Sequence, residues 1–191
     1  FAEDHDGRVP RGASPTGGNI WFTAFMPYLG TQKVTGDYRA VKIFRCPAYP
    51  VRTQTICYVV GAWDLADPQD LNGFTAEGMT RLSQYKRLAQ NAYLADNAWY
   101  PNRPIIVDDS DAKMIRECDV FIRRHLPDST DEGISSGRRV ARDRHRQGGN
   151  VLFADWHASY VEAKAMAGVE RHLGERAPGV EMWGWRKMGR F

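Results

Sequence analysis

The segment from 144 to 162, RHRQGGNVLFADWHASYVE, constrains the fold of this chain more than any other part of it. Two short runs rich in β-forming residues, 151–154 and 158–161, flank the polar and aromatic corner Asp155-Trp156-His157. This pattern is typical of a β-hairpin. We expect the chain to come into that hairpin through a turn at Gly148-Gly149, because paired glycines favour tight turns. The segment therefore predicts antiparallel pairing of its two runs.

A second segment, Ala92-Tyr93-Leu94-Ala95-Asp96, has the same pattern as residues 151–155: a short apolar run that closes on Ala-Asp. We expect the two to be strands of one sheet, each with an aspartate at its carboxyl edge. The β-rich runs 55–60 and 105–107 should add further strands.

Helical spacing of apolar residues appears in three places. Residues 19–29 predict a helix with Asn19 as its N-cap and Pro27 near its end, and residues 114–126 and 162–173 also have apolar stripes at helical spacing. The polar, arginine-rich segment 128–144 is interpreted as a flexible loop. Strands and helices in this mixture favour an α+β fold.

Composition limits the class of protein. A chain of 191 residues with 42% hydrophobic residues fits one globular domain with a real core, spanning 1–191. The net charge is +3, from 26 basic and 23 acidic residues, so we expect no nucleic-acid partner. No run approaches the ~20 apolar residues that a membrane-spanning helix needs.

The chain has three cysteines, Cys46, Cys57 and Cys118. The separation of Cys46 and Cys57 permits a small disulfide loop in an oxidising compartment, while spacing alone does not establish the bond. Three buried thiols are the alternative.

The residues with chemical potential gather around the hairpin. His145, Asp155 and His157, joined by Asp96 and by Asp108 or Asp109, have the donor types that hold zinc, manganese or iron. The alternative assigns His145 and Asp155 to hydrogen bonds that hold the start and the corner of the hairpin, and we expect this structural role. We accordingly expect no cofactor and no catalytic residue.

Two weaker patterns have other interpretations. Asp4-x-Asp6-Gly7 is part of a calcium loop, yet the downstream oxygen ligands are missing. Gly7 and Pro10 predict the end of a helix instead, with residues 1–7 as its last turns. The arginines of 138–146 and the six tryptophans permit an acidic or glycan ligand, although core packing is the commoner fate of tryptophan.

The hairpin segment resembles the C-terminal signature of bacterial prepilin-type proteins, in which a His is followed by nine residues and Asp-Gly. Here the match runs from His145 through Gly148, Gly149 and Asn150 to Asp155, with Trp156 in place of the glycine and His157 after it. The segment Asp4–Pro10 is also similar to the end of the long N-terminal helix of pseudopilins, and Phe44-x-Cys46-Pro47 to a further element of the family.

The resemblance implies a pilin-like fold: an N-terminal helix, largely missing from this chain, packed on an antiparallel sheet with a C-terminal hairpin and a short helix. It implies a non-enzymatic subunit of a type IV pilus-like filament or a type II secretion pseudopilus. Its partners would be related pilin subunits and, through the missing helix, the inner membrane, in an extracellular or periplasmic location. The alternatives are a metal- or glycan-binding domain displayed on such a scaffold, which would take calcium or a transition metal, and a metal-dependent hydrolase.

Overall fold

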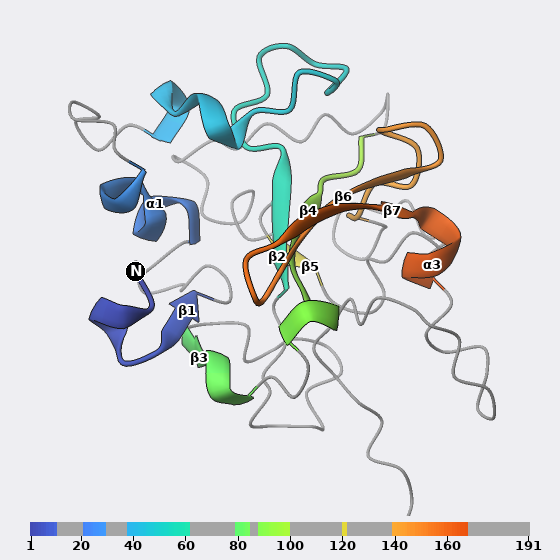
Figure 1. Ribbon diagram of the computed structural model, residues 1–191. Helices are drawn as coiled ribbons and strands as arrows, with labels where there is room; N and C mark the ends of the chain where they lie inside the picture. The colour runs from blue at the N-terminus through green and yellow to red at the C-terminus, as the bar shows by residue number, and fades with distance from the viewer. Residues whose placement is uncertain are drawn as a thin grey trace, which may run out of the picture.

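The computed structural model in Figure 1 describes residues 1–10, 21–29, 38–61, 79–84, 88–99, 120–121 and 139–167. Its main feature is a five-stranded sheet. In their order across the sheet, the strands are β5 (Val120–Phe121), β2 (Tyr58–Gly61), β4 (Ala92–Asp96), β6 (Gly148–Phe153) and β7 (Ala158–Glu162). The four strands from β2 to β7 pair antiparallel, and β5 joins β2 in parallel. With a few short helices beside it, this sheet confirms the α+β class.

The predicted hairpin is present. Strands β6 and β7 pair antiparallel in a register that runs from Gly148 opposite Glu162 to Leu152 opposite Ala158. The two glycines do not form a turn, contrary to expectation, but are the first residues of β6. The reason is steric: a β-carbon on Gly148 would lie 2.1 Å from the carbonyl oxygen of Val161, so the glycine allows close approach of β7.

The reversal between β6 and β7 occurs at the corner 153–157. The N–H of Trp156 donates to the carbonyl of Phe153 at 2.9 Å, and the N–H of Phe153 donates to the carbonyl of His157 at 2.9 Å. Trp156 has a φ of 73°, in the left-handed region. This arrangement is that of a three-residue hairpin loop, in which glycine normally occupies the left-handed position.

The N-terminal segment is a 3₁₀ helix, η1 (Glu3–His5), followed by the strand β1 (Arg8–Pro10), which pairs antiparallel with β3 (Met79–Arg81). Asp6 and Gly7 both have left-handed φ values, 57° and 69°, and the N–H of Gly7 donates to the carbonyl of Ala2 at 2.8 Å. These are the features of a helix C-terminus, as predicted from Gly7. Asp6 forms an ion pair with Arg81.

The main core cluster lies where β2 and β4 of the sheet pack against β1 and the short helical segments. The short helix α1 (Trp21–Phe25) continues into the 3₁₀ helix η2 (Met26–Tyr28), which contains Pro27, as the sequence predicted. The buried residues of the main cluster are Val9, Trp21, Phe22, Met26, Tyr38, Val41, Phe44, Ile56, Val60 and Tyr93. Figure 1 shows α1 and β1 beside the sheet and α3 (Ala163–Ala167) directly after β7. Within the described residues, no helix is both long and apolar enough to cross a bilayer.

One further expectation needs correction. Residues 114–126 were expected to be helical, but Val120 and Phe121 extend along β2 as a strand, where Phe121 is fully buried. The predicted flexible loop 128–144 is described only over its last six residues, where Val140 forms a bridge with Asn97 and Arg139 is 4% exposed. The expected strand 105–107 lies outside the described residues.

Candidate functional site

The candidate site lies where β4 ends and β6 begins. Because these strands are antiparallel and Ala95 faces Val151, Asp96 comes level with Asn150. The N–H of Asn150 donates to Oδ2 of Asp96 at 2.6 Å. His145 lies five residues before Asn150 along the chain, and its ring returns to the same carboxylate. The hairpin signature therefore meets the other Ala-Asp strand of the sheet at this point.

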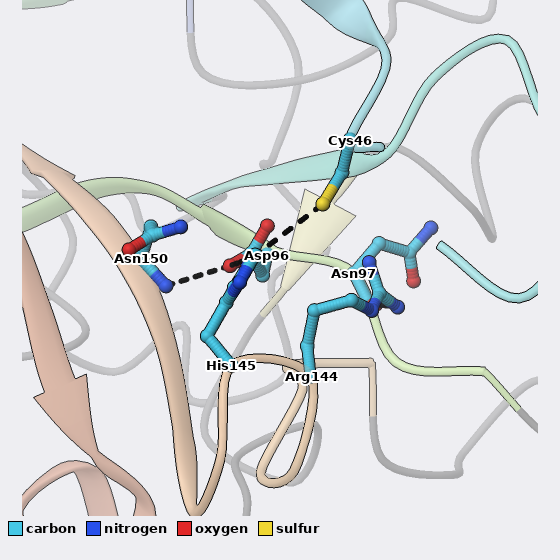
Figure 2. Close-up of polar contacts among 6 residues, drawn as sticks. All are labelled: Cys46, Asp96, Asn97, Arg144, His145 and Asn150. Carbon is cyan, nitrogen blue, oxygen red and sulfur yellow. Dashed lines mark hydrogen bonds and ion pairs between the residues drawn. The ribbon is translucent and has the colours of Figure 1, made fainter. Parts of the chain in front are cut away.

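Three side chains converge here, as Figure 2 shows. Nε2 of His145 lies 3.2 Å from Oδ2 of Asp96 and 3.4 Å from Sγ of Cys46. The three donor atoms lie within 4.8 Å of one another. Asp96 is 1% exposed and Cys46 is 7% exposed, whereas the side chain of His145 is 29% exposed. The cluster is thus buried on two sides and reached by solvent past the histidine.

Backbone hydrogen bonds hold the three segments together. The N–H of Asn97 donates to the carbonyl of Cys57, and the N–H of Cys57 donates to the carbonyl of Phe44, each at 2.9 Å. The N–H of Ala141 donates to the carbonyl of Asp96 at 2.8 Å. These bonds join the segments that carry Cys46 and His145 to the end of β4, so the site does not depend on side-chain contacts alone.

Arg144 brings a positive charge to the edge of the cluster. Its guanidinium donates to the carbonyl of Asn97 and lies 4.1 Å from the centre of the Tyr49 ring. This geometry combines a hydrogen bond with a cation–π contact. Arg144 is accordingly half-buried, whereas Arg142 and Arg146 are exposed.

Burial disfavours the ionised forms of Asp96 and Cys57. Desolvation raises the pKa of Asp96, against the hydrogen bond from the Asn150 N–H and the charges of His145 and Arg144. Desolvation likewise raises the pKa of the Cys57 thiol to about 11, so Cys57 is an inert neutral thiol at neutral pH. Oδ1 of Asp96 is buried and has no hydrogen-bond partner among the residues that the structure describes. A buried carboxylate oxygen in this state is costly unless another ligand reaches it.

The predicted group His145, Asp155 and His157 is divided by the fold. Asp155 and His157 lie in the hairpin corner, at the end of β6 opposite to His145. Nδ1 of His157 lies 2.5 Å from Oδ1 of Asp155, and its ring stacks on Phe153 with centroids 4.3 Å apart. Antiparallel pairing is the cause, since it sends the carboxyl ends of β4 and β6 in opposite directions. The structure therefore does not bring His145 and Asp155 together at one metal site.

The other residues predicted as metal ligands, and the two cysteines of the possible disulfide, lie as follows. Asp96 does join His145, as the metal alternative allowed, while Asp108 and Asp109 lie outside the described residues. Cys46 and Cys57 are both free thiols, so the disulfide loop that their spacing permits is not formed in the structure. Cys46 instead faces His145, 99 residues away in sequence. Sequence analysis missed this partner, since no local pattern joins positions so far apart.

Comparison of the chain with protein-family models, with curated proteins and with solved structures gave no match.

Proposed function

We propose that this chain is the globular part of a pilin-like subunit, a non-enzymatic building block of a type IV pilus-like filament or of a type II secretion pseudopilus. The proposal rests on the resemblance of the hairpin segment to the prepilin-type signature. In the structure that segment forms the β6–β7 hairpin and supplies His145 to the candidate site.

One observation carries the proposal. The family has Asp-Gly where this chain has Asp155 followed by Trp156, so the residue identity departs from the motif at its most restrictive step. Trp156 nevertheless has a φ of 73°, a backbone conformation that glycine adopts freely and tryptophan rarely does. The resemblance thus extends from residue identities to the backbone conformation that the glycine would serve.

A second observation supports it. The turn at Asp6 and Gly7 has the left-handed geometry of a helix C-terminus, at the place where the resemblance puts the end of the filament-forming helix. In a subunit of this class, that helix would anchor the protein in the inner membrane and pack in the filament core. The sheet and its hairpin would then face outward, in the periplasm or at the cell surface.

Cells that produce the full-length protein provide the test. We expect mass spectrometry of the mature protein to find a new N-terminus immediately before an apolar helix that precedes Phe1. Antibodies raised against the 191-residue chain should label filaments in sheared surface fractions, or a membrane-bound pool if the protein serves a pseudopilus. A mature protein without an apolar N-terminal helix, free of both membrane and filament, would contradict the proposal.

A further inference from the structure

We propose that Cys46, Asp96 and His145 bind a transition-metal ion of the zinc class. This inference goes beyond the subunit role and does not depend on it. It introduces Cys46 as a ligand and removes Asp155 and His157 from the set.

The spacing of the three donor atoms supports a metal site. Zinc bonds of about 2.3 Å to sulfur and about 2.0–2.1 Å to nitrogen and oxygen, at tetrahedral angles, place sulfur roughly 3.5 Å from nitrogen and nitrogen roughly 3.3 Å from oxygen. The observed distances are 3.4 Å from Sγ of Cys46 to Nε2 of His145, and 3.2 Å from Nε2 to Oδ2 of Asp96. Both distances to Nε2 match edges of one coordination tetrahedron, and all three donor atoms lie within 4.8 Å of one another.

One nitrogen of the His145 ring, Nε2, faces both Cys46 and Asp96. In a Cys-His-Asp relay, the thiol and the carboxylate contact opposite nitrogens of the imidazole ring. Here Cys46 and Asp96 both approach Nε2 of His145, which has at most one hydrogen to donate. A proton at Nε2 serves one partner at a time, whereas a metal ion in its place binds all three donors at once.

Asp96 is buried, and only one of its two carboxylate oxygens has a hydrogen-bond partner among the described residues. The carboxylate is 1% exposed, and the N–H of Asn150 is directed at Oδ2, while Oδ1 has no hydrogen-bond partner in the part of the chain that the structure describes. A metal ion at the cluster would compensate the negative charge of the buried Asp96 carboxylate. The nearby cation, Arg144, is directed at the carbonyl of Asn97 and the Tyr49 ring, so it does not take the place of the ion.

The donor set also indicates which metal. A thiolate with an imidazole and one carboxylate suits zinc and other transition ions, whereas calcium and magnesium take oxygen donors. A thiolate at Cys46 and a carboxylate at Asp96 together balance the charge of a divalent ion. Three protein ligands leave a fourth position, which water or a ligand from a neighbouring molecule can fill, on the side where His145 is exposed.

The test uses the reduced 191-residue chain, stripped with a chelator, with circular dichroism to establish that it is folded. We expect titration with zinc to give one site per chain, and cobalt in its place to give the thiolate-to-metal absorption band of a cysteine ligand. Cys46→Ser, Asp96→Asn and His145→Gln should each weaken zinc binding by at least about 100-fold, beyond the effect typical of residues that only support ligands.

Two variants are matched controls. Cys57→Ala removes a buried thiol that is not in the set, and His157→Gln removes the other histidine paired with an aspartate, so both should bind zinc as the parent chain does. X-ray absorption of the zinc-loaded parent chain gives a readout that needs no variant to fold. One sulfur with nitrogen and oxygen ligands supports the site. A folded parent chain that takes up no zinc, zinc without a sulfur ligand, or binding abolished by His157→Gln would overturn it.

Discussion

Trp156 shows at the scale of one residue how backbone conformation and side-chain identity conflict in this hairpin. Its left-handed φ of 73° is disfavoured for a residue with a β-carbon, yet its indole makes an edge contact with the buried Tyr93 at 5.5 Å between ring centroids. The corner therefore exchanges some backbone strain for aromatic packing. The neighbouring pair of Asp155 and His157 adds a local hydrogen bond within the same turn.

Two substitutions separate the strain from the packing. Trp156→Ala and Trp156→Gly both remove the indole, but only glycine accepts the left-handed backbone without a steric cost. We expect the glycine variant to be more stable than the alanine variant by roughly 0.5–1 kcal/mol, after the entropy that glycine gains in the unfolded chain. Urea denaturation of both variants measures the difference. Equal stability would mean that the corner relaxes to a negative φ.

The ionisation of Asp155 should make the stability of the folded chain depend on pH. Partial desolvation acts to raise the pKa of Asp155, but the hydrogen bonds from the ring and backbone of His157 outweigh it, and the pKa lies below the ordinary value of 3.8. The ionised form is therefore favoured in the folded state, and its contribution is present above pH 3.8 and lost as the pH falls through the lowered pKa.

Asp155→Asn should for this reason lower the thermal midpoint slightly near neutral pH and have no such effect at about pH 2. The change should be small because the side chain of Asp155 is 34% exposed. A difference between the two proteins that grows as the pH falls would contradict the assignment.

At the scale of elements, strand β6 connects the hairpin with the candidate site. Its first residue, Gly148, lies against the backbone of β7, and its second, Gly149, lies against the side chain of Asp96. One strand thus meets a backbone on one side and a carboxylate on the other within two residues. The Gly-Gly pair serves these two close approaches rather than a reversal of the chain.

The two glycines therefore respond differently to a methyl group. A β-carbon at Gly148 would lie 2.1 Å from the carbonyl oxygen of Val161, so the strands must separate, and we expect Gly148→Ala to cost about 1–3 kcal/mol. A β-carbon at Gly149 would lie 3.3 Å from Cβ of Asp96, and this contact yields with a small shift. Gly149→Ala should thus cost less, as chemical denaturation would show. The reverse order would mean that β7 is not held in this register.

At the scale of the whole molecule, the sheet brings together residues from three distant segments. Cys46 precedes β2, Asp96 ends β4, and His145 precedes β6, and these strands are neighbours in the sheet. The proposed subunit role places the assembly surface elsewhere, in the helix expected before Phe1. The domain and its assembly element are therefore separable in this proposal.

This separation predicts the behaviour of the isolated chain. Without the filament-forming helix, the 191-residue chain should be mostly monomeric, whereas the proposed subunit role expects the full-length protein to assemble. Light scattering coupled to size-exclusion chromatography would measure the mass over a range of concentrations. A stable oligomer of high order would place an assembly surface in the domain itself, against the proposed division.

Features that depend on neighbouring residues could be predicted from the amino-acid sequence alone. The alternation of apolar residues in 151–161 specified the hairpin, the run 92–96 specified a strand of the same sheet, and Gly7 specified the end of a helical turn. These are local preferences, set by side-chain spacing and by the φ values that each residue tolerates. The helical pattern over 114–126 misled at Val120–Phe121 because short apolar runs suit both helix and strand.

Strand order and register in the folded chain determine which chemical groups meet. His145 was recognised from its spacing to Asp155, but the antiparallel order of β4 and β6 pairs it with Asp96 and takes Asp155 to the other end of the sheet. Cys46 reaches the same point across 99 residues of chain. No periodicity specifies such a contact, since strand order and register, rather than sequence distance, determine where the ends of strands coincide.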